Sequence, residues 1–280
     1  MQPLQLDSIP IYCINLERRT DRWNLLKSQP GFHEFKSIQR YIGVDGKLLN
    51  IKEDPRISFF TKRNILLNTR RAHEELSTAG GVGCYLSHVG LWQKFLESSA
   101  QVAFILEDDN KLPAGIAHTI QSFFNASPIL ADPTQWDFCV LSPHPSPIYT
   151  KIKEPFHGSD TLFRYERFIS LAGYMITRRG VERVLPHLFP IESHIDAFLS
   201  VASSLNIIDL VGPKKLIMNI IETKSDIQDK DQCFICDVDT HYEKDSVIIP
   251  KTTYWRYQAE EALILSALAY GMYVAWSKRK

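Results

Sequence analysis

Residues 80–110 constrain the fold of this chain more than any other segment does. Apolar residues recur at helical spacing over 86–96, and residues 102–106 (Val-Ala-Phe-Ile-Leu) form a continuous apolar run of strand length. Three acids follow this run directly: Glu107, Asp108 and Asp109. Because ligands bind at the carboxyl ends of strands in an open α/β sheet, the segment predicts an α/β fold with a polar site at this strand end. Gly80, Gly81 and Gly83 predict a flexible start to the helix.

The three acids have two interpretations from the sequence alone. They fit a solvated polar loop, and they also fit a divalent-cation site that is fixed by the strand before it. Glu107 and Asp109 are alternate residues, so an extended backbone would direct both side chains to the same face. Carboxylate oxygens suit Mg²⁺ or Mn²⁺, which leave coordination positions for diphosphate oxygens. We expect Asp109 to be the first ligand and Glu107 the second.

Composition narrows the class of protein. The 280 residues are 44% hydrophobic, enough for a substantial core, and the formal net charge of zero gives no reason to expect nucleic acid as a partner. Five cysteines are scattered along the chain and do not form a disulfide framework. The first ten residues have neither a basic nor an apolar signal region, so we expect no secretory signal and a cytoplasmic location.

Strands and helices are predicted to alternate along the chain, which indicates an α/β sheet in one domain. The predicted strands are 9–14, 38–42, 102–106, 136–141, strands within 167–177, and 207–211. The predicted helices are 20–29, 84–96, 115–125, 178–187 and 196–205.

Three segments do not follow this alternation. Residues 47–76 are polar and poorly periodic and predict an insertion or a mobile segment, while the proline-rich residues 142–156 predict an irregular loop. Residues 262–276 are apolar on all sides and are followed by Lys278-Arg-Lys280. This run is shorter than the roughly 20 residues that a spanning helix needs, so it predicts either a docked terminal helix or a peripheral anchor at a membrane interface. Cys233 and Cys236, with His241, make only a weak zinc motif.

Three further parts of the chain carry polar side chains with two interpretations each. Asn15, Arg18 and Arg22 follow the first strand, where they fit either a solvated helix start or a site for an anionic nucleotide. Ser87 and His88 fit a packed, hydrogen-bonded pair better than a catalytic one. Asp196 precedes an apolar helix, where it fits a helix cap or a general base.

Taken together, these motifs resemble glycosyltransferase family 25, which includes lipopolysaccharide and lipooligosaccharide galactosyltransferases and collagen galactosyltransferase domains. The resemblance rests on motifs that occur in the family's order over about residues 9–227. They are Ile-Asn-Leu-Glu-Arg at 14–18 with Arg22, Gly-Val-Asp-Gly at 43–46, Gly-Cys-Tyr-Leu-Ser-His at 83–88 with Trp92, Ile-Leu-Glu-Asp-Asp at 105–109, Ala-Gly-Tyr-Met-Ile at 172–176 with Arg179 and Gly180, Ile195 with Asp196, and Lys-Ser-Asp-Ile at 224–227.

The resemblance implies a GT-A fold, which is Rossmann-like and binds nucleotide sugars, as a single domain with a mixed sheet over residues 1–250, with an apolar, basic-ended helix over 251–280. It further implies a nucleotide-sugar donor (most often UDP-galactose), Mn²⁺ or Mg²⁺, and inversion at the anomeric carbon. The implied metal ligands are Asp109 and Glu107, with Asp108 nearby. The implied nucleotide pocket contains Asn15, Arg18, Arg22 and Asp45. The resemblance also suggests Ser87 and His88 near the donor and Asp226 near the metal or diphosphate. Asp196 is our candidate for the general base.

The acceptor follows from the resemblance less directly. Because collagen-modifying members enter the secretory pathway and we expect no secretory signal here, we expect a hydroxyl of a lipopolysaccharide or lipid-linked oligosaccharide, with possible peripheral contact to the inner membrane through residues 262–280. Three alternatives stay open: a catalytically silent nucleotide- or carbohydrate-binding partner in an assembly, a protein (collagen-like) glycosyltransferase, and a metal-independent glycoside hydrolase that uses two carboxylates.

Overall fold

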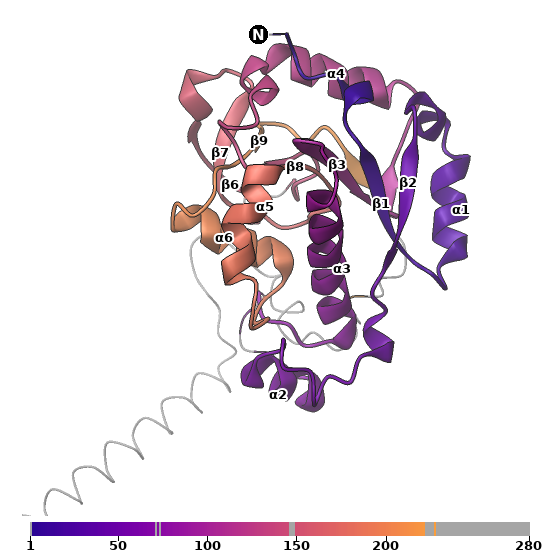
Figure 1. Cartoon of the computed structure of the whole chain (residues 1–280), viewed down its shortest axis with the longest axis vertical. Helices are drawn as coiled ribbons and strands as arrows, with labels where there is room; N and C mark the ends of the chain where they lie inside the picture. The colour runs from indigo at the N-terminus through magenta and orange to yellow at the C-terminus, as the bar shows by residue number, and fades with distance from the viewer. Residues whose placement is uncertain (1, 71, 73, 146–148, 222–226, 228–280) are drawn as a thin grey trace, which may run out of the picture. The chain divides into compact units, whose positions relative to one another are not determined.

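The computed structural model describes residues 2–70, 72, 74–145, 149–221 and 227. Its main feature is an eight-stranded mixed sheet with the strand order β2-β1-β3-β8-β5-β9-β7-β6 (Figure 1). The strands are β1 (Ile11–Leu16), β2 (Ile38–Gly43), β3 (Val102–Glu107), β5 (Phe138–Val140), β6 (Lys151–Pro155), β7 (Leu162–Arg167), β8 (Gly173–Thr177) and β9 (Leu210–Pro213). A second, two-stranded sheet pairs β4 (Asn110–Lys111) with β10 (Asn219–Ile220).

Helices cover both faces of the large sheet (Figure 1). The α-helices are α1 (Thr20–Ser28), α2 (Phe59–Leu67), α3 (Ala79–Leu96), α4 (Ile116–Ala126), α5 (Arg178–Val184) and α6 (Ile195–Ser204). Six short 3₁₀-helices lie at Leu6–Ser8, Pro30–Glu34, Gly46–Leu48, Pro128–Ala131, Phe156–Gly158 and Leu185–His187.

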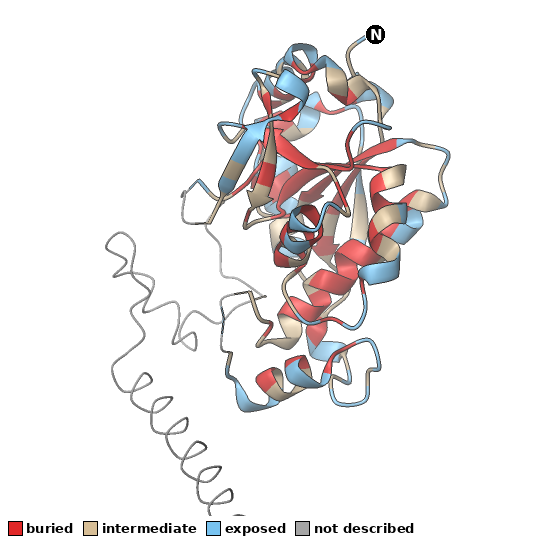
Figure 2. Ribbon diagram, turned by 90° about the vertical axis from the view of Figure 1, so that its left-hand side faces the viewer, coloured by how far each residue is buried: buried red, intermediate tan, exposed pale blue. Residues whose placement is uncertain are grey.

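Strand β3 shows why the apolar run at 102–106 is continuous instead of alternating. Ala103 and Ile105 belong to the core cluster on the α3 side, whereas Phe104 and Leu106 belong to the cluster on the α4 side. A strand that is covered on both faces needs apolar residues at every position. Figure 2 shows the same result as a buried central sheet between partly exposed helices.

The sheet is mixed because β8 and β7 each run antiparallel to both of their neighbours. Strands β2, β1 and β3 run parallel, β8 runs antiparallel to both β3 and β5, and β9 is again parallel to β5. The carboxyl ends of β1, β2 and β3 therefore meet at one edge of the sheet. This arrangement confirms the predicted α/β fold with a mixed sheet in one domain, and it is consistent with a GT-A-like Rossmann fold.

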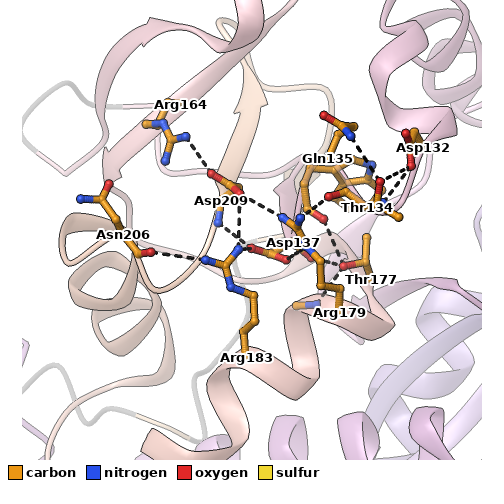
Figure 3. A network of polar contacts seen from close by, with 12 residues as sticks. Asp132, Thr134, Gln135, Asp137, Arg164, Thr177, Arg179, Arg183, Asn206 and Asp209 are labelled. Carbon is orange, nitrogen blue, oxygen red and sulfur yellow. Dashed lines mark hydrogen bonds and ion pairs between the residues drawn. The ribbon is translucent and has the colours of Figure 1, made fainter.

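The far side of the sheet is fixed by a network of arginines and carboxylates (Figure 3). Asp137 is fully buried, and it accepts hydrogen bonds from Arg179 Nε at 2.8 Å and Arg183 Nη1 at 2.6 Å. The backbone N–H of Asp209 donates to Asp137 Oδ2 at 2.7 Å, and Arg179 also reaches Asp209 Oδ2 at 2.9 Å. The network connects α5 to the N-terminal ends of β5 and β9, because Asp137 and Asp209 directly precede these strands.

Most predicted elements are confirmed, within a few residues at their ends, and three expectations are wrong. The loop predicted at 142–156 contains β6, an edge strand, where Pro155 is tolerated because an edge strand has one unpaired side. Residues 47–76 contain α2 and are held to the rest of the chain by bridges from Ile57 to Ile191 and from Glu75 to Ser193. Gly80, Gly81 and Gly83 lie within the first turns of α3 and are not a flexible start.

Several predictions fall outside the described part of the chain. These are Asp226, the pair Cys233 and Cys236 with His241, the boundary at residues 250 and 251, and the apolar segment at 262–280. Over the residues that the structure does describe, no helix combines the length and apolar character that crossing a bilayer requires.

Candidate functional site

A pocket lies where the carboxyl ends of β1, β2 and β3 meet the N-terminal half of α3. Eight of the predicted site residues line it: Asn15, Arg18, Arg22, Asp45, Ser87, His88, Glu107 and Asp108. Of the remaining predicted residues, Asp109 and Asp196 are not among the lining residues that the structure describes, and Asp226 lies outside the described chain. The fold therefore brings together residues from four separate motifs of the sequence.

Arg22 on α1 joins two of the three acids. Its Nη1 lies 2.9 Å from Asp108 Oδ1, and its Nη2 lies 2.9 Å from Asp109 Oδ2. Asn15 Nδ2 donates to Asp108 Oδ2 at 2.5 Å, and Asn15 Oδ1 accepts from Arg40 Nε at 2.8 Å. Asn15 and Arg22 thus hold the acids in place, and a solvated helix start is not the arrangement found here.

Glu107 belongs to a different set of contacts. Its Oε1 lies 3.1 Å from His88 Nε2, while His88 Nδ1 lies 2.9 Å from the Tyr174 hydroxyl. Trp92 Nε1 donates to the same hydroxyl at 2.7 Å. Because His88, Trp92 and Tyr174 are fully buried, this chain of contacts fixes the imidazole that faces Glu107.

The expectation that Glu107 and Asp109 share one face of an extended strand is wrong. Strand β3 ends at Glu107, and the backbone turns at Asp108 and Asp109 before β4 begins at Asn110. Glu107 therefore contacts His88 on α3, whereas Asp109 contacts Arg22 on α1. The acids still lie close enough for Glu107 and Asp108 to raise the pKa of Asp109.

The electrostatics of the acids favour a bound cation. Burial, followed by the charge of Glu107, raises the pKa of Asp109 from its ordinary 3.8 to about 7, and burial also raises the pKa of Asp108. The Oδ1 atom of Asp109 is buried and has no hydrogen-bond partner among the described residues. Because a buried carboxylate oxygen without a partner is costly, the residues fit the hard divalent cation that the resemblance implies.

Asp45 and Arg18 form the opposite wall of the pocket. Arg18 Nε donates to Asp45 Oδ2 at 2.5 Å, and this contact is the main reason that the pKa of Asp45 lies below its ordinary value. Asp45 Oδ1 also accepts from the N–H of Lys47 at 3.0 Å and so caps the short helix at Gly46–Leu48. The pair presents a charged, hydrogen-bonded edge beside the acids.

Ser87 supports this wall from α3. Its hydroxyl accepts from the N–H of Val44 at 2.8 Å and donates to the carbonyl of Gly83 at 2.6 Å. A Cβ on Gly83 would lie 2.6 Å from Gly46 N, so glycine is needed for the close approach of α3 to the turn at 43–46. The predicted role of Ser87 near the donor is therefore accompanied by a positioning role.

Asp196 is placed at the start of α6. Its Oδ2 accepts from the N–H of Ser170 at 2.9 Å, and Ser170 adopts a left-handed backbone with φ of 82°. Asp196 also lies near enough to Cys84 for its charge to raise the pKa of that thiol, although burial is the larger cause. Asp196 thus stabilises a strained turn beside the pocket, and its assignment as general base stays a prediction.

Cys84 and Lys47 are pocket residues with reactive or charged side chains that reasoning from the sequence did not assign to the site. Cys84 is the more informative of the two. It lines the pocket beside Ser87 and His88, one helical turn before His88. Its position within the motif at 83–88 was visible in the sequence, but a lone cysteine on a helix gives no sign of what it faces. Ile227 also lines the pocket, and its carbonyl accepts a hydrogen bond from the Thr78 hydroxyl.

The fold and this site define a class of protein. An open, largely parallel α/β region with acids and arginines at its strand ends is the arrangement of enzymes that bind nucleotide-type ligands. The sequence model of glycosyltransferase family 25, described as an LPS biosynthesis protein, matches residues 8–199. The chain belongs to glycosyltransferase family 25.

Curated relatives agree with this family. A glycosyltransferase 25 family member of Anopheles gambiae is 26% identical over 195 residues, covering 66% of this chain and 31% of the relative. Procollagen galactosyltransferase 1-B of Xenopus laevis is 26% identical over 179 residues, covering 62% of this chain and 28% of the relative. Putative glycosyltransferase R655 of Acanthamoeba polyphaga mimivirus is 30% identical over 105 residues, covering 37% and 29%. The chain thus spans about a third of the length of these relatives.

Proposed function

We propose that this chain transfers a hexose, galactose from UDP-galactose in the first instance, from a nucleotide sugar to an acceptor hydroxyl with inversion at the anomeric carbon. The proposal rests on the two ion pairs that Arg22 makes with Asp108 and Asp109. Arg22 and Asp108 line the pocket together with Asn15 and Asp45. All of these residues lie inside the region that the family model matches.

The acids and the arginines are proposed to bind different parts of the donor: the acids bind the cation and the arginines bind phosphate oxygens. Glu107 and Asp109 are the proposed ligands of Mn²⁺ or Mg²⁺, with Asp108 held beside them by Asn15. A bound divalent cation neutralises the charge that develops on a leaving diphosphate. Arg18 and Arg22 supply guanidinium donors of the kind that bind phosphate oxygens. The orphaned Oδ1 of Asp109 supports a cation at this position.

Asp196 is the proposed general base. Inversion requires a base that takes the proton of the acceptor hydroxyl on the face of the sugar opposite the diphosphate. Asp196 lies on α6, near the pocket residue Cys84 and on an element other than those that carry the three acids. Its two carboxylate oxygens accept from backbone N–H groups of Ser170 and Ala197, which would fix its orientation toward an acceptor.

Two acceptor classes have support from the comparisons. The family description names LPS biosynthesis, which favours a sugar hydroxyl of a lipid-linked oligosaccharide at the cytoplasmic face of the inner membrane. The procollagen galactosyltransferases among the relatives favour a hydroxylated side chain of a collagen-like protein. The procollagen galactosyltransferases are named for galactose transfer, which supports UDP-galactose as the donor.

The test is release of UDP from a panel of nucleotide sugars, with Mn²⁺ or with EDTA, and with either a lipooligosaccharide mixture or a hydroxylysine-containing collagen peptide. We expect turnover that depends on the cation and is highest with UDP-galactose. Asp160→Asn is the matched control, because Asp160 is an exposed carboxylate outside the pocket. Absence of cation-dependent turnover with every donor and both acceptors would overturn the proposal in favour of a catalytically silent binding partner.

A further inference from the structure

Cys84, His88 and Glu107 form a cluster of potential metal ligands, and two of them, Cys84 and His88, are not proposed ligands of the donor cation. Cys84 and His88 are four residues apart on α3 and so lie on one face of the helix, and Glu107 reaches them from the end of β3. One ligand atom from each side chain lies within 4.8 Å of the others. All three residues line the pocket, so a cation bound there would have one side open to ligands.

The surroundings of His88 match those of a metal-bound imidazole. A ligating histidine usually has a fixed hydrogen-bond partner on its second ring nitrogen. Here the Tyr174 hydroxyl lies 2.9 Å from Nδ1, and Trp92 in turn holds that hydroxyl. The other nitrogen, Nε2, is 3.1 Å from Glu107 Oε1. Ligand atoms at about 2.0 to 2.3 Å from zinc in tetrahedral geometry lie roughly 3 to 4 Å apart, so this separation suits two ligands of one ion.

We propose that Cys84, His88 and Glu107 bind a thiophilic divalent cation, Zn²⁺ foremost, at a site that has Glu107 in common with the proposed donor cation but not its other ligand, Asp109. Thiolate and imidazole ligands select zinc and related ions over Mg²⁺ and Mn²⁺. On binding, the Cys84 thiol releases its proton to solvent as the sulfur–metal bond forms. Three protein ligands leave the fourth position open toward the pocket, as in catalytic zinc sites.

This second site shares Glu107 with the proposed donor cation. Zn²⁺ would therefore withdraw Glu107 from the donor cation and occupy space in the donor pocket. Competition between the two cations rests on the proposed function, whereas zinc binding itself rests only on the three side chains. A zinc-loaded chain is expected to bind Mn²⁺ and UDP more weakly than the zinc-free chain.

Titration of the full metal-free chain with Co²⁺ tests the site directly, because a cobalt–thiolate bond gives a near-ultraviolet charge-transfer band that carboxylate ligands do not give. Cys233 and Cys236 supply other thiols, so three proteins are compared: the native chain, Cys84→Ser, and Cys233→Ser with Cys236→Ser. We expect the band in the native chain and in the double variant, its loss in Cys84→Ser, and its displacement by Zn²⁺.

The cobalt titration has outcomes that support the zinc site and outcomes that overturn it. A band that persists in Cys84→Ser, or no band in any of the three proteins, overturns the proposal. His88→Gln gives a second test and should weaken Co²⁺ binding at least tenfold while circular dichroism shows a folded chain. Calorimetry of Mn²⁺ and UDP on Cys84→Ser reports on the donor site, so failure of one site is distinguishable from failure of the other.

Helix α2 provides an independent observation, because four of its five apolar side chains are exposed and only Ile65 packs against the core. Phe59, Phe60, Leu66 and Leu67 are 77%, 52%, 63% and 66% exposed, whereas Thr61 and Asn64 are buried. Figure 1 shows α2 beside one end of α3. The pocket residues Gly80 and Cys84 lie in the first two turns of α3.

Polar contacts hold this helix in its inverted orientation. Asn64 Nδ2 donates to Glu75 Oε2 at 2.9 Å, and the Ser58 hydroxyl accepts from the N–H of Thr61 at 3.2 Å as the helix cap. The N–H of Ser58 donates to the carbonyl of Ile191 at 3.1 Å. Ser58, Thr61 and Asn64 are thus bonded to other groups of the protein, and these contacts leave Phe59, Phe60, Leu66 and Leu67 facing outward.

We infer that α2 docks on the surface of a bilayer that contains anionic lipids. Aromatic and leucine side chains beside basic residues are typical of helices that lie in the membrane interface. Residues 47–70 contain six basic residues and two acids, and one of the acids, Asp54, pairs with Arg56 at 2.6 Å. This excess of positive charge complements the charge of anionic headgroups.

Vesicle co-sedimentation of the full chain tests this surface. We expect binding to phosphatidylglycerol vesicles, weaker binding to phosphatidylcholine, and at least a tenfold loss when Phe59, Leu66 and Leu67 are changed together to Ser. Val201→Ser with Leu205→Ser is the matched control, because these residues are 57% and 65% exposed on α6 and at its end. Unchanged vesicle binding by the α2 variant overturns the inference and would assign the membrane contact to residues 262–280. Self-association through α2 without any vesicle binding also overturns it.

Discussion

The guanidinium of Arg22 lies 2.9 Å from Asp109 Oδ2, so a charged side chain contacts the acid whose pKa is raised most among the three acids that end β3 and begin the next turn. One guanidinium shared by Asp108 and Asp109 only partly offsets the burial of both acids, since the pKa of each remains raised. The ionised forms of Asp108 and Asp109 are therefore unfavourable without a divalent cation, and this has measurable consequences.

The first consequence is a pH dependence of stability in the metal-free chain. The pKa of Asp109 is raised from 3.8 to about 7 by burial, so the folded state binds this proton more tightly than the unfolded chain does. The unfavourable contribution of Asp109 is absent below pH 4, grows as the pH rises through the interval to about 7, and is complete above it. Thermal unfolding in EDTA should show the native chain losing stability relative to Asp109→Asn across this interval. Parallel curves for the two proteins would contradict the prediction.

The second consequence concerns the cation itself. Asp109→Ala removes one proposed ligand and leaves Arg22 to pair with Asp108 alone. We expect calorimetry to show loss of the Mn²⁺-dependent part of UDP binding, by about tenfold or more. Asp160→Asn should bind UDP as the native chain does. Unchanged binding of UDP and Mn²⁺ by Asp109→Ala would remove Asp109 from the metal site.

The three acids show which features of the site could be predicted from the sequence and which depend on tertiary structure. Their place at a strand end was predictable, because the apolar run at 102–106 and the acids that follow are contiguous in the chain. The turn at Asp108 and Asp109 was not predictable, since it depends on the pairing of β4 with β10 more than 100 residues later. The contacts of Glu107 with His88 and of Asp109 with Arg22 depend on that turn.

The same distinction applies to helices. The period of apolar residues predicted α3, because one face of that helix packs on the sheet. It could not predict α2, in which four of the five apolar side chains are exposed and the fully buried side chains, Thr61 and Asn64, are polar. A helix with inverted polarity gives no usable signal to a method that assigns apolar residues to the core.

Asp196 gives the third prediction, which separates a catalytic from a structural role. Asp196→Asn keeps an oxygen that accepts from the N–H of Ser170, so the strained turn at Ser170 should be retained. If Asp196 is the base, donor binding by calorimetry stays native while the rate of transfer falls by about 10² or more. Asp196→Ala should in addition lower the thermal midpoint. Near-native turnover by Asp196→Asn would exclude Asp196 as the base.

Gly83 gives the fourth prediction, on the wall of the pocket. A Cβ at this position would lie 2.6 Å from Gly46 N and Val44 O, so Gly83→Ala must push α3 away from the turn at 43–46. Overpacking of this kind costs about 1–3 kcal/mol. We expect lower stability together with weaker UDP binding, because Asp45 moves with the turn. Gly115→Ala is a useful contrast: a Cβ there meets no atom within 4 Å, although its φ of 83° adds strain, so it should lose stability without a change in UDP affinity.

The last prediction concerns the network in Figure 3, far from the pocket in sequence. Asp137 is fully buried and carries Arg179, Arg183 and the N–H of Asp209 on its two oxygens. Asp137→Asn would replace one acceptor with a donor and leave two guanidinium groups short of a carboxylate, which typically costs about 3–5 kcal/mol when a buried pair is broken. Urea denaturation should show a lower midpoint with an unchanged slope, while Asp160→Asn should change stability by no more than about 0.5 kcal/mol. A native midpoint for Asp137→Asn would mean that this network does not stabilise the join between α5, β5 and β9.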